Sequence, residues 1–107
     1  MEDLELVSFQ IISSVGAARS MYIEAIGEAK KGHFEEADRL IEEGAQIFLE
    51  GHKAHSSLIQ KEASGEHVNV TLLLMHAEDQ LMTTDSFKIV AQEFVDVYRH
   101  QMKNQTV

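Results

Sequence analysis

Apolar residues recur every three or four positions along three long stretches of this chain, the spacing that places them on one face of an α-helix. The stretches cover residues 4–31, 34–63 and 71–101. Gly32 and Gly65 stand at the two breaks, and glycine is the residue that most often follows the end of a helix. No segment alternates apolar and polar residues in the way that predicts a strand. We therefore expect an all-α fold, an antiparallel bundle of three long helices.

The same spacing predicts which side of each helix is buried. For the first helix these positions are Leu4, Ser8, Ile11, Val15, Ala18, Tyr22, Ala25 and Ala29. For the second they are Ala37, Ile41, Gly44, Phe48, His55 and Leu58, and late in the third they are Val90, Phe94, Val97 and Tyr98. Gly16 and Gly27 inside the first helix are expected to mark close contacts with a neighbouring helix. The three apolar faces exceed what one small core can cover, so part of this surface is expected to form an oligomer interface.

Composition and charge exclude several classes of protein. The 107 residues suffice for one domain, residues 1–107, with one modest core. Without cysteine the chain has no disulfide, no thiolate chemistry and no cysteine-based zinc site. The formal net charge of −9 repels phosphate backbones, so no nucleic-acid partner is expected. No apolar run approaches the ~20 residues that span a bilayer, and the acidic start does not resemble a signal peptide, so no direct membrane insertion and a cytoplasmic location are expected.

The third helix carries polar groups on a face that should be apolar. Four residues spaced by seven fall on one side, which is expected to be solvated: Glu78, Asp85, Gln92 and Arg99. The opposite stripe consists of Leu72, His76, Thr83, Val90 and Phe94. Asp79 and Gln80 flank His76, and burying such groups without partners costs about 1–3 kcal/mol each. The pattern predicts either a buried polar network that sets helix register or oligomeric state, or a reactive histidine with supporting groups, and the residues alone leave both open.

Two histidines of the second helix, His52 and His55, could instead join His76 and Asp79 around a transition metal. Di-iron helix bundles use Glu-x-x-His pairs and further glutamates from facing helices. This chain offers His-x-x-His on one helix and His-x-x-Asp on the next, so its pattern matches such a site poorly.

Four segments, residues 16–20, 32–37, 60–65 and 76–83, resemble the lactose/cellobiose-type enzyme IIA of the bacterial phosphoenolpyruvate-dependent sugar phosphotransferase system, and the resemblance covers nearly the whole chain. The signature of that family reads His-Ala-Gln-Asp-His-Leu-Met, and its first histidine carries a phosphoryl group, which implies this role for His76. The chain departs from the family at Glu78 and Gln80, which replace Gln and the second His, and at His55, where the family usually shows Gln. Glu78 is expected to matter little on its solvated side, whereas Gln80, Thr83 and His55 are expected to support His76.

The resemblance also implies an assembly and a set of partners. The assembly is a homotrimer of three-helix protomers, nine helices in all, with His76 in the groove between protomers. Asp79 would lie at the threefold axis, where it can hold a structural Mg²⁺. The implied donor is the phosphohistidine of HPr, the implied acceptor is a cysteine of the cognate IIB component, and the sugar is of the lactose, cellobiose or chitobiose type. The alternative is a non-catalytic helical oligomerisation or interaction module, in which the polar stripe only sets register.

Overall fold

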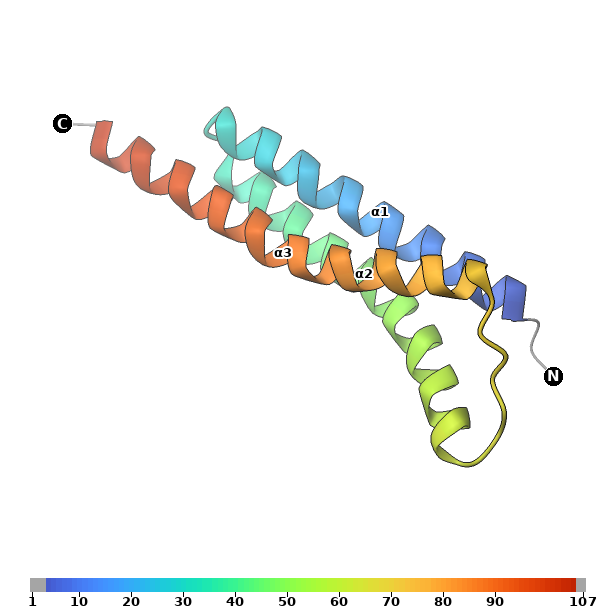
Figure 1. The fold of residues 1–107 in the computed structure, drawn as a ribbon. Coiled ribbons are helices and arrows are strands. Elements are labelled where there is room, and N and C mark those ends of the chain that lie inside the picture. The colour runs from blue at the N-terminus through green and yellow to red at the C-terminus, as the bar shows by residue number, and fades with distance from the viewer. Residues whose placement is uncertain (1–3, 106–107) are drawn as a thin grey trace.

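The computed structural model describes residues 4–105, which form three helices, α1 (Leu4–Lys30), α2 (Phe34–Ala63) and α3 (Leu72–Gln105). Figure 1 shows an elongated up-down-up arrangement, in which a tight turn joins α1 to α2 and a longer loop returns the chain to α3. The second half of α2 diverges from the other two helices toward that loop (Figure 1). The principal extents are 62 × 20 × 20 Å. No strand occurs between residues 4 and 105, so the prediction of an all-α chain with three long helices is confirmed.

Glycine ends the first two helices in the predicted places. Gly32 has a φ of 84°, and its N–H donates to the carbonyl of Ala29 while the N–H of His33 donates to the carbonyl of Glu28. The same pair of hydrogen bonds forms around Gly65, whose φ is 96°. This is the Schellman motif, which needs a left-handed residue that glycine adopts without steric cost. The two breaks seen in the sequence are therefore the two turns of the bundle.

The start of α3 is set by Thr71, whose hydroxyl oxygen accepts a hydrogen bond from the N–H of Leu74 at 3.1 Å. Such a cap satisfies one of the backbone donors that a helix start leaves unpaired. At its other end α3 continues to Gln105, beyond the predicted end at residue 101. None of the helices within residues 4–105 has the length and apolar character needed to cross a membrane.

The buried face of α1 agrees closely with the sequence prediction. Ser8, Ile11, Val15, Ala18, Tyr22, Ala25 and Ala29 are buried, Leu4 is half-buried, and Val7 joins the buried set. On α2 the predicted residues Ala37, Ile41, Gly44 and Leu58 are buried, and Phe48 and His55 are half-buried. The core has two clusters, one around Tyr22 and one around Ile11 and Val15, and Phe48 packs against both. The three- and four-residue spacing therefore predicted the packing of these two helices.

The close contact between α1 and α2 occurs at glycines of α2, not at Gly16 and Gly27 of α1. A Cβ added at Gly16 or Gly27 would meet nothing within 4 Å, so the expectation for these two residues was wrong. At Gly44 an added Cβ would lie 2.7 Å from Cε1 of Tyr22, and at Gly51 it would lie 3.0 Å from Cγ1 of Val15. The glycines of α1 stand beside its buried line, whereas Gly44 and Gly51 are themselves buried against α1.

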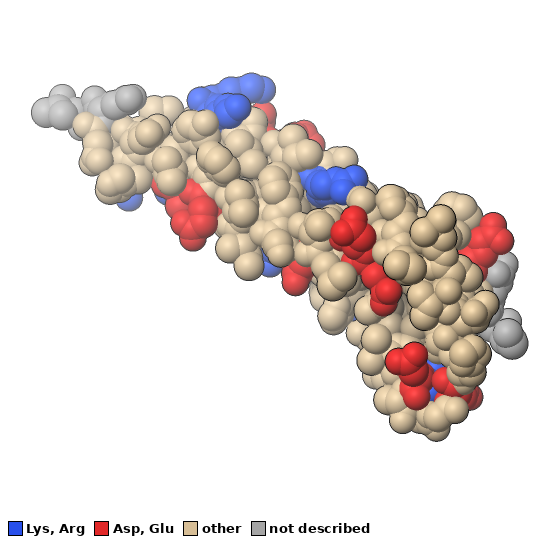
Figure 2. Space-filling view, viewed as in Figure 1, with Lys and Arg blue, Asp and Glu red and all other residues tan. Residues whose placement is uncertain are grey.

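The face of α3 that packs inward differs from the predicted one. The buried residues are Leu74, Ala77, Leu81, Thr84, Ala91 and Val95. The stripe containing His76 points outward, with Leu72 83% exposed and Phe94 46% exposed, so the expectation that Val90, Phe94 and Val97 belong to the core was wrong. Small residues such as Ala77 and Ala91 stand between Leu74, Leu81 and Val95 on the inward face and let α3 approach its neighbours closely. On the face drawn in Figure 2, acidic and basic side chains are scattered over a surface that is largely neither.

Candidate active site

His76 lies in the second turn of α3 on the outward stripe and is exposed. Its ring makes no hydrogen bond or ion pair to any other residue between 4 and 105. Leu72 and Met75, 83% and 55% exposed, are its apolar neighbours on the helix. The imidazole ring can therefore be reached from outside this chain. An exposed imidazole on an apolar surface is able to accept a group from a partner that docks on the surface.

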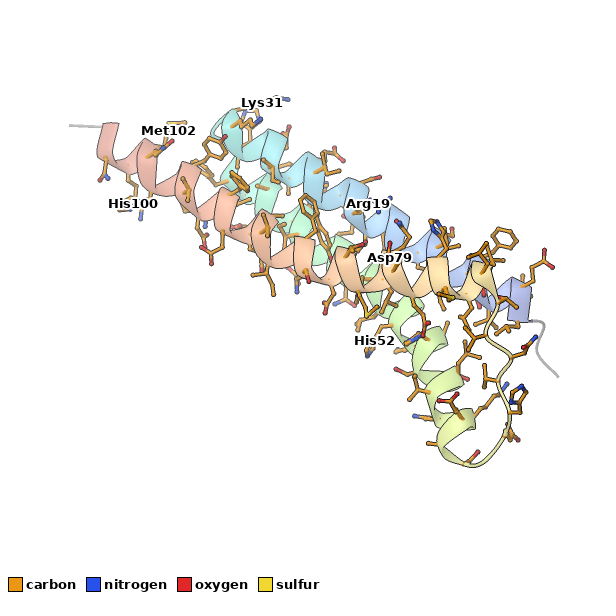
Figure 3. The ribbon with its side chains drawn as sticks, viewed as in Figure 1. Arg19, Lys31, His52, Asp79, His100 and Met102 are labelled. Carbon is orange, nitrogen blue, oxygen red and sulfur yellow. The ribbon has the colours of Figure 1, made fainter. Side chains whose placement is uncertain are left out.

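Gln80, one turn after His76, is hydrogen-bonded to a residue that was not among the predicted supporting residues. The guanidinium of Arg19 on α1 donates a hydrogen bond from Nη1 to Oε1 of Gln80 on α3. Both residues are half-buried, and the contact joins positions 61 residues apart. Figure 3 labels Arg19 on α1 and Asp79 on the neighbouring part of α3. The sequence carries two signals for Arg19: it lies in the segment 16–20 that resembles the family, and it is the only lysine or arginine among the first 29 residues.

Thr83 is occupied by its own helix. Its hydroxyl donates to the carbonyl oxygens of Asp79, at 2.8 Å, and Gln80, at 3.3 Å. Seven residues of helix place Thr83 about 10 Å from His76 along the axis. The structure therefore does not bring the Thr83 hydroxyl to the histidine.

His55 contacts Glu78, not His76. Its Nε2 lies 2.7 Å from Oε2 of Glu78, and the pair links α2 to α3. The side chains of His55 and Glu78 are 18% and 34% exposed. The prediction that Glu78 lies on a freely solvated side was therefore wrong. Residues 76 and 78 are about 200° apart around a helix, so this pair lies on the side of α3 away from His76. Arg99 likewise reaches α2, through a 2.7 Å bond to Asp38, because the seven-residue polar line follows the seam between α2 and α3.

The alternative transition-metal site does not form. His52 is exposed and stacks on the ring of Phe48, with centroids 6.4 Å apart. His55 is paired with Glu78. Across residues 4–105, no three His, Cys, Asp or Glu side chains gather closely enough to hold a metal ion. Asp79 is exposed on the outward stripe and could ligate a metal only together with groups from another chain.

Comparison with known proteins places this chain in a family. Residues 6–99 match the family described as the lactose/cellobiose-specific IIA subunit of the PTS system. The lactose-specific EIIA component of Staphylococcus aureus (strain N315) is 39% identical over 98 residues, which cover 92% of this chain and 95% of the relative. The oligo-beta-mannoside-specific EIIA component of Bacillus subtilis (strain 168) is 43% identical over 95 residues, which cover 89% of this chain and 86% of that relative.

A solved structure agrees with these relatives. The crystal structure of the PTS cellobiose-specific enzyme IIA from Bacillus anthracis superposes with a TM-score of 0.89 at 36% identity, covering 98% of this chain and 96% of that one. The family match spans most of the chain and includes all of the segment from His76 to Thr83. The chain therefore belongs to the lactose/cellobiose-specific IIA family of the sugar phosphotransferase system, whose members are phosphoryl carriers.

Proposed function

We propose that this chain accepts a phosphoryl group from phospho-HPr on His76 and passes it to a cysteine of a cognate IIB component. The observation that carries the proposal is the exposed, unbonded ring of His76 on an apolar helix face, within the family-matched run His-Ala-x-Asp-x-Leu-Met. A carrier needs a nucleophile that two different partners can reach in turn. The net charge of −9 favours encounter with a basic surface on the donor.

Each transfer exchanges one bond to phosphorus for another. A ring nitrogen of His76 with a free lone pair attacks phosphorus in line. The bond from phosphorus to the donor nitrogen breaks, its electron pair stays on that nitrogen, and the donor ring takes up a proton while the other ring nitrogen of His76 loses one. In the second step a thiolate of IIB attacks, the bond to His76 breaks, and the ring regains its proton. Little energy separates such states, so catalysis consists mainly of positioning.

A homotrimer would complete the site. The exposed side of α3 carries four large apolar residues whose side chains are each between 46% and 63% exposed: Met75, Met82, Ile89 and Phe94. Exposed apolar surface of this extent favours association with further copies. Three copies meeting along α3 would give a nine-helix assembly with His76 in a groove between protomers. The surrounding apolar side chains would then keep water from the phosphorylated histidine.

Asp79 is the residue that would hold a structural Mg²⁺ in this assembly. One chain supplies one exposed carboxylate, and three copies would bring three together. Oxygen ligands are those that Mg²⁺ prefers, and three unpaired carboxylates in a desolvated interior would repel one another strongly. The ion therefore fits the donor set only across copies, and its contribution would be to offset this repulsion.

The sugar is proposed from the relatives, which are named for lactose, cellobiose and oligo-beta-mannosides. A disaccharide of the lactose, cellobiose or chitobiose type is the proposed substrate of the complete system. No step assigned to His76 requires this chain to touch the sugar.

The decisive experiment is incubation with phosphoenolpyruvate, enzyme I and HPr, followed by mass spectrometry. The wild-type chain should gain one acid-labile phosphoryl group. His76→Ala should fold and gain none, whereas His52→Ala, which removes an exposed histidine of α2, should behave as wild type. Phosphorylation of His76→Ala would refute the assignment. A wild-type chain that gains no phosphoryl group would refute the carrier function and favour a helical interaction module.

A further inference from the structure

The contact between Arg19 and Gln80 ties α1 to α3 one turn after His76. Arg19 stands in the middle of α1 next to the buried Ala18, and its head reaches across to the turn that follows His76. This chain has twice as many acids as bases. It is therefore unusual that a half-buried arginine donates its hydrogen bond to a neutral amide and not to a carboxylate. Its other N–H groups carry positive charge close to the turn of the reactive histidine.

The chemistry of guanidinium determines how the Gln80 amide is turned. Arginine has five N–H donors and no acceptor, so only the amide oxygen of Gln80 can face it. The amide NH₂ must then point away from Arg19. Long side chains on a helix lean toward its N-terminus, over the residues three and four positions earlier. For Gln80 that direction leads to the turn containing His76.

From this geometry we propose that Arg19 is a positioning residue, which anchors Gln80 so that the amide NH₂ of Gln80 donates a hydrogen bond to the phosphoryl group on His76. The inference rests on the proposed carrier function. A phosphoryl group adds about −1.5 to −2 charges and three acceptor oxygens, and an amide NH₂ is a donor only. The hydrogen bond therefore exists in the phosphorylated state and is absent from the unphosphorylated one. The hydrogen bond should therefore shift the equilibrium of phosphoryl transfer toward the phosphorylated form of this chain.

The measurement is the equilibrium constant for transfer between phospho-HPr and this chain. Arg19→Met and Gln80→Met each remove one member of the unit with little change in side-chain length. Each should lower the constant about tenfold to a hundredfold, the usual effect of one hydrogen bond to a charged group. The double variant should fall no further than the lower single variant, because Arg19 acts through Gln80. Arg19→Lys, which keeps a donor, should recover most of the loss.

The matched control is Arg39→Met. Arg39 is an exposed arginine of α2 whose guanidinium pairs with Glu36 and Glu43, away from α3. Its replacement should leave the equilibrium constant unchanged. A role of Arg19 in folding alone would lower the stability of both states equally and leave the constant at the wild-type value, which would overturn the inference.

Two further readouts keep the inference testable if a variant fails to fold. In the wild-type chain the side-chain amide resonances of Gln80 should move on phosphorylation, and unmoved resonances would overturn the inference. Gln80→His should change the pH dependence of the equilibrium constant near 6.5 relative to the wild-type chain, because the new histidine titrates there whereas the amide of Gln80 donates at every pH. A wild-type chain that takes up the phosphoryl group while the Arg19 and Gln80 variants match it would refute this inference and leave the carrier function standing.

Discussion

The packing of α2 on α1 at Gly44 can be tested by comparing two alanine substitutions. Alanine is favoured over glycine inside a helix by about 1 kcal/mol, and this gain applies both at Gly44 and at Gly16. At Gly16 an added Cβ would meet nothing within 4 Å, so Gly16→Ala should raise the free energy of unfolding by about 1 kcal/mol. At Gly44 the same atom would lie 2.7 Å from Cε1 of Tyr22 and 3.3 Å from the carbonyl oxygen of Ala18.

The difference between the two variants isolates the steric contact. Tyr22 is completely buried, so its ring has little room to move, and overpacking of a core costs about 1–3 kcal/mol. Because the helix-propensity gain cancels, Gly44→Ala should be less stable than Gly16→Ala by about 1–3 kcal/mol. Urea unfolding followed by circular dichroism measures this gap, at one protein concentration because the proposed assembly would shift the midpoint. In thermal melts the gap should be about 4–8 °C for each kcal/mol. A Gly44→Ala chain as stable as Gly16→Ala would refute this account of the packing.

Two further predictions concern ionisation and assembly. Burial, with a smaller contribution from Asp85, raises the pKa of Tyr22 from 10.0 to about 12. An unfolded tyrosine therefore loses its proton first, and stability should fall as the pH rises from 10 to 12, by at most about 1.4 kcal/mol for each pH unit. Tyr22→Phe should make that loss smaller in urea titrations over this range, and an unchanged pH dependence would contradict the assignment. If the proposed trimer and its shared ion exist, Asp79→Leu should still sediment as a trimer in analytical ultracentrifugation, with a melting temperature insensitive to a chelator, because no carboxylates remain to repel one another. Soluble monomers, or a wild-type melting temperature that chelation leaves unaltered, would rule out the shared ion.

The local sequence pattern was sufficient to predict the three helices and the buried face of α1. Each of these depends on residues within a few positions of one another: the spacing of Ile11, Val15 and Ala18, or the left-handed glycine at Gly32 and Gly65. The run that begins at His76 could also be recognised from the sequence alone, because its consecutive residues resemble a family signature. These features need no knowledge of what lies across the bundle.

Packing between residues far apart in the sequence decided which side of α3 is buried. A helical projection of α3 divides its residues into sides, but it does not say which side meets α1 and α2. The inward side is the one on which the small residues Ala77 and Ala91 alternate with apolar ones such as Leu81, because short side chains let the helix axes approach while the larger ones fill the space between them. His76 therefore faces outward, and Glu78 turns to His55 across the seam between α2 and α3.

The support for His76 shows the same division between sequence and structure. The sequence by itself pointed to His76 as the proposed nucleophile and to Asp79 and Gln80 as its neighbours on the same helix, because helical spacing places them. It did not reveal the contact of Gln80 with Arg19, which is 61 positions away. A contact between residues so far apart depends on how two helices pack, and packing depends on the shapes of all the side chains between them. Only the tertiary structure brings that cation to the site.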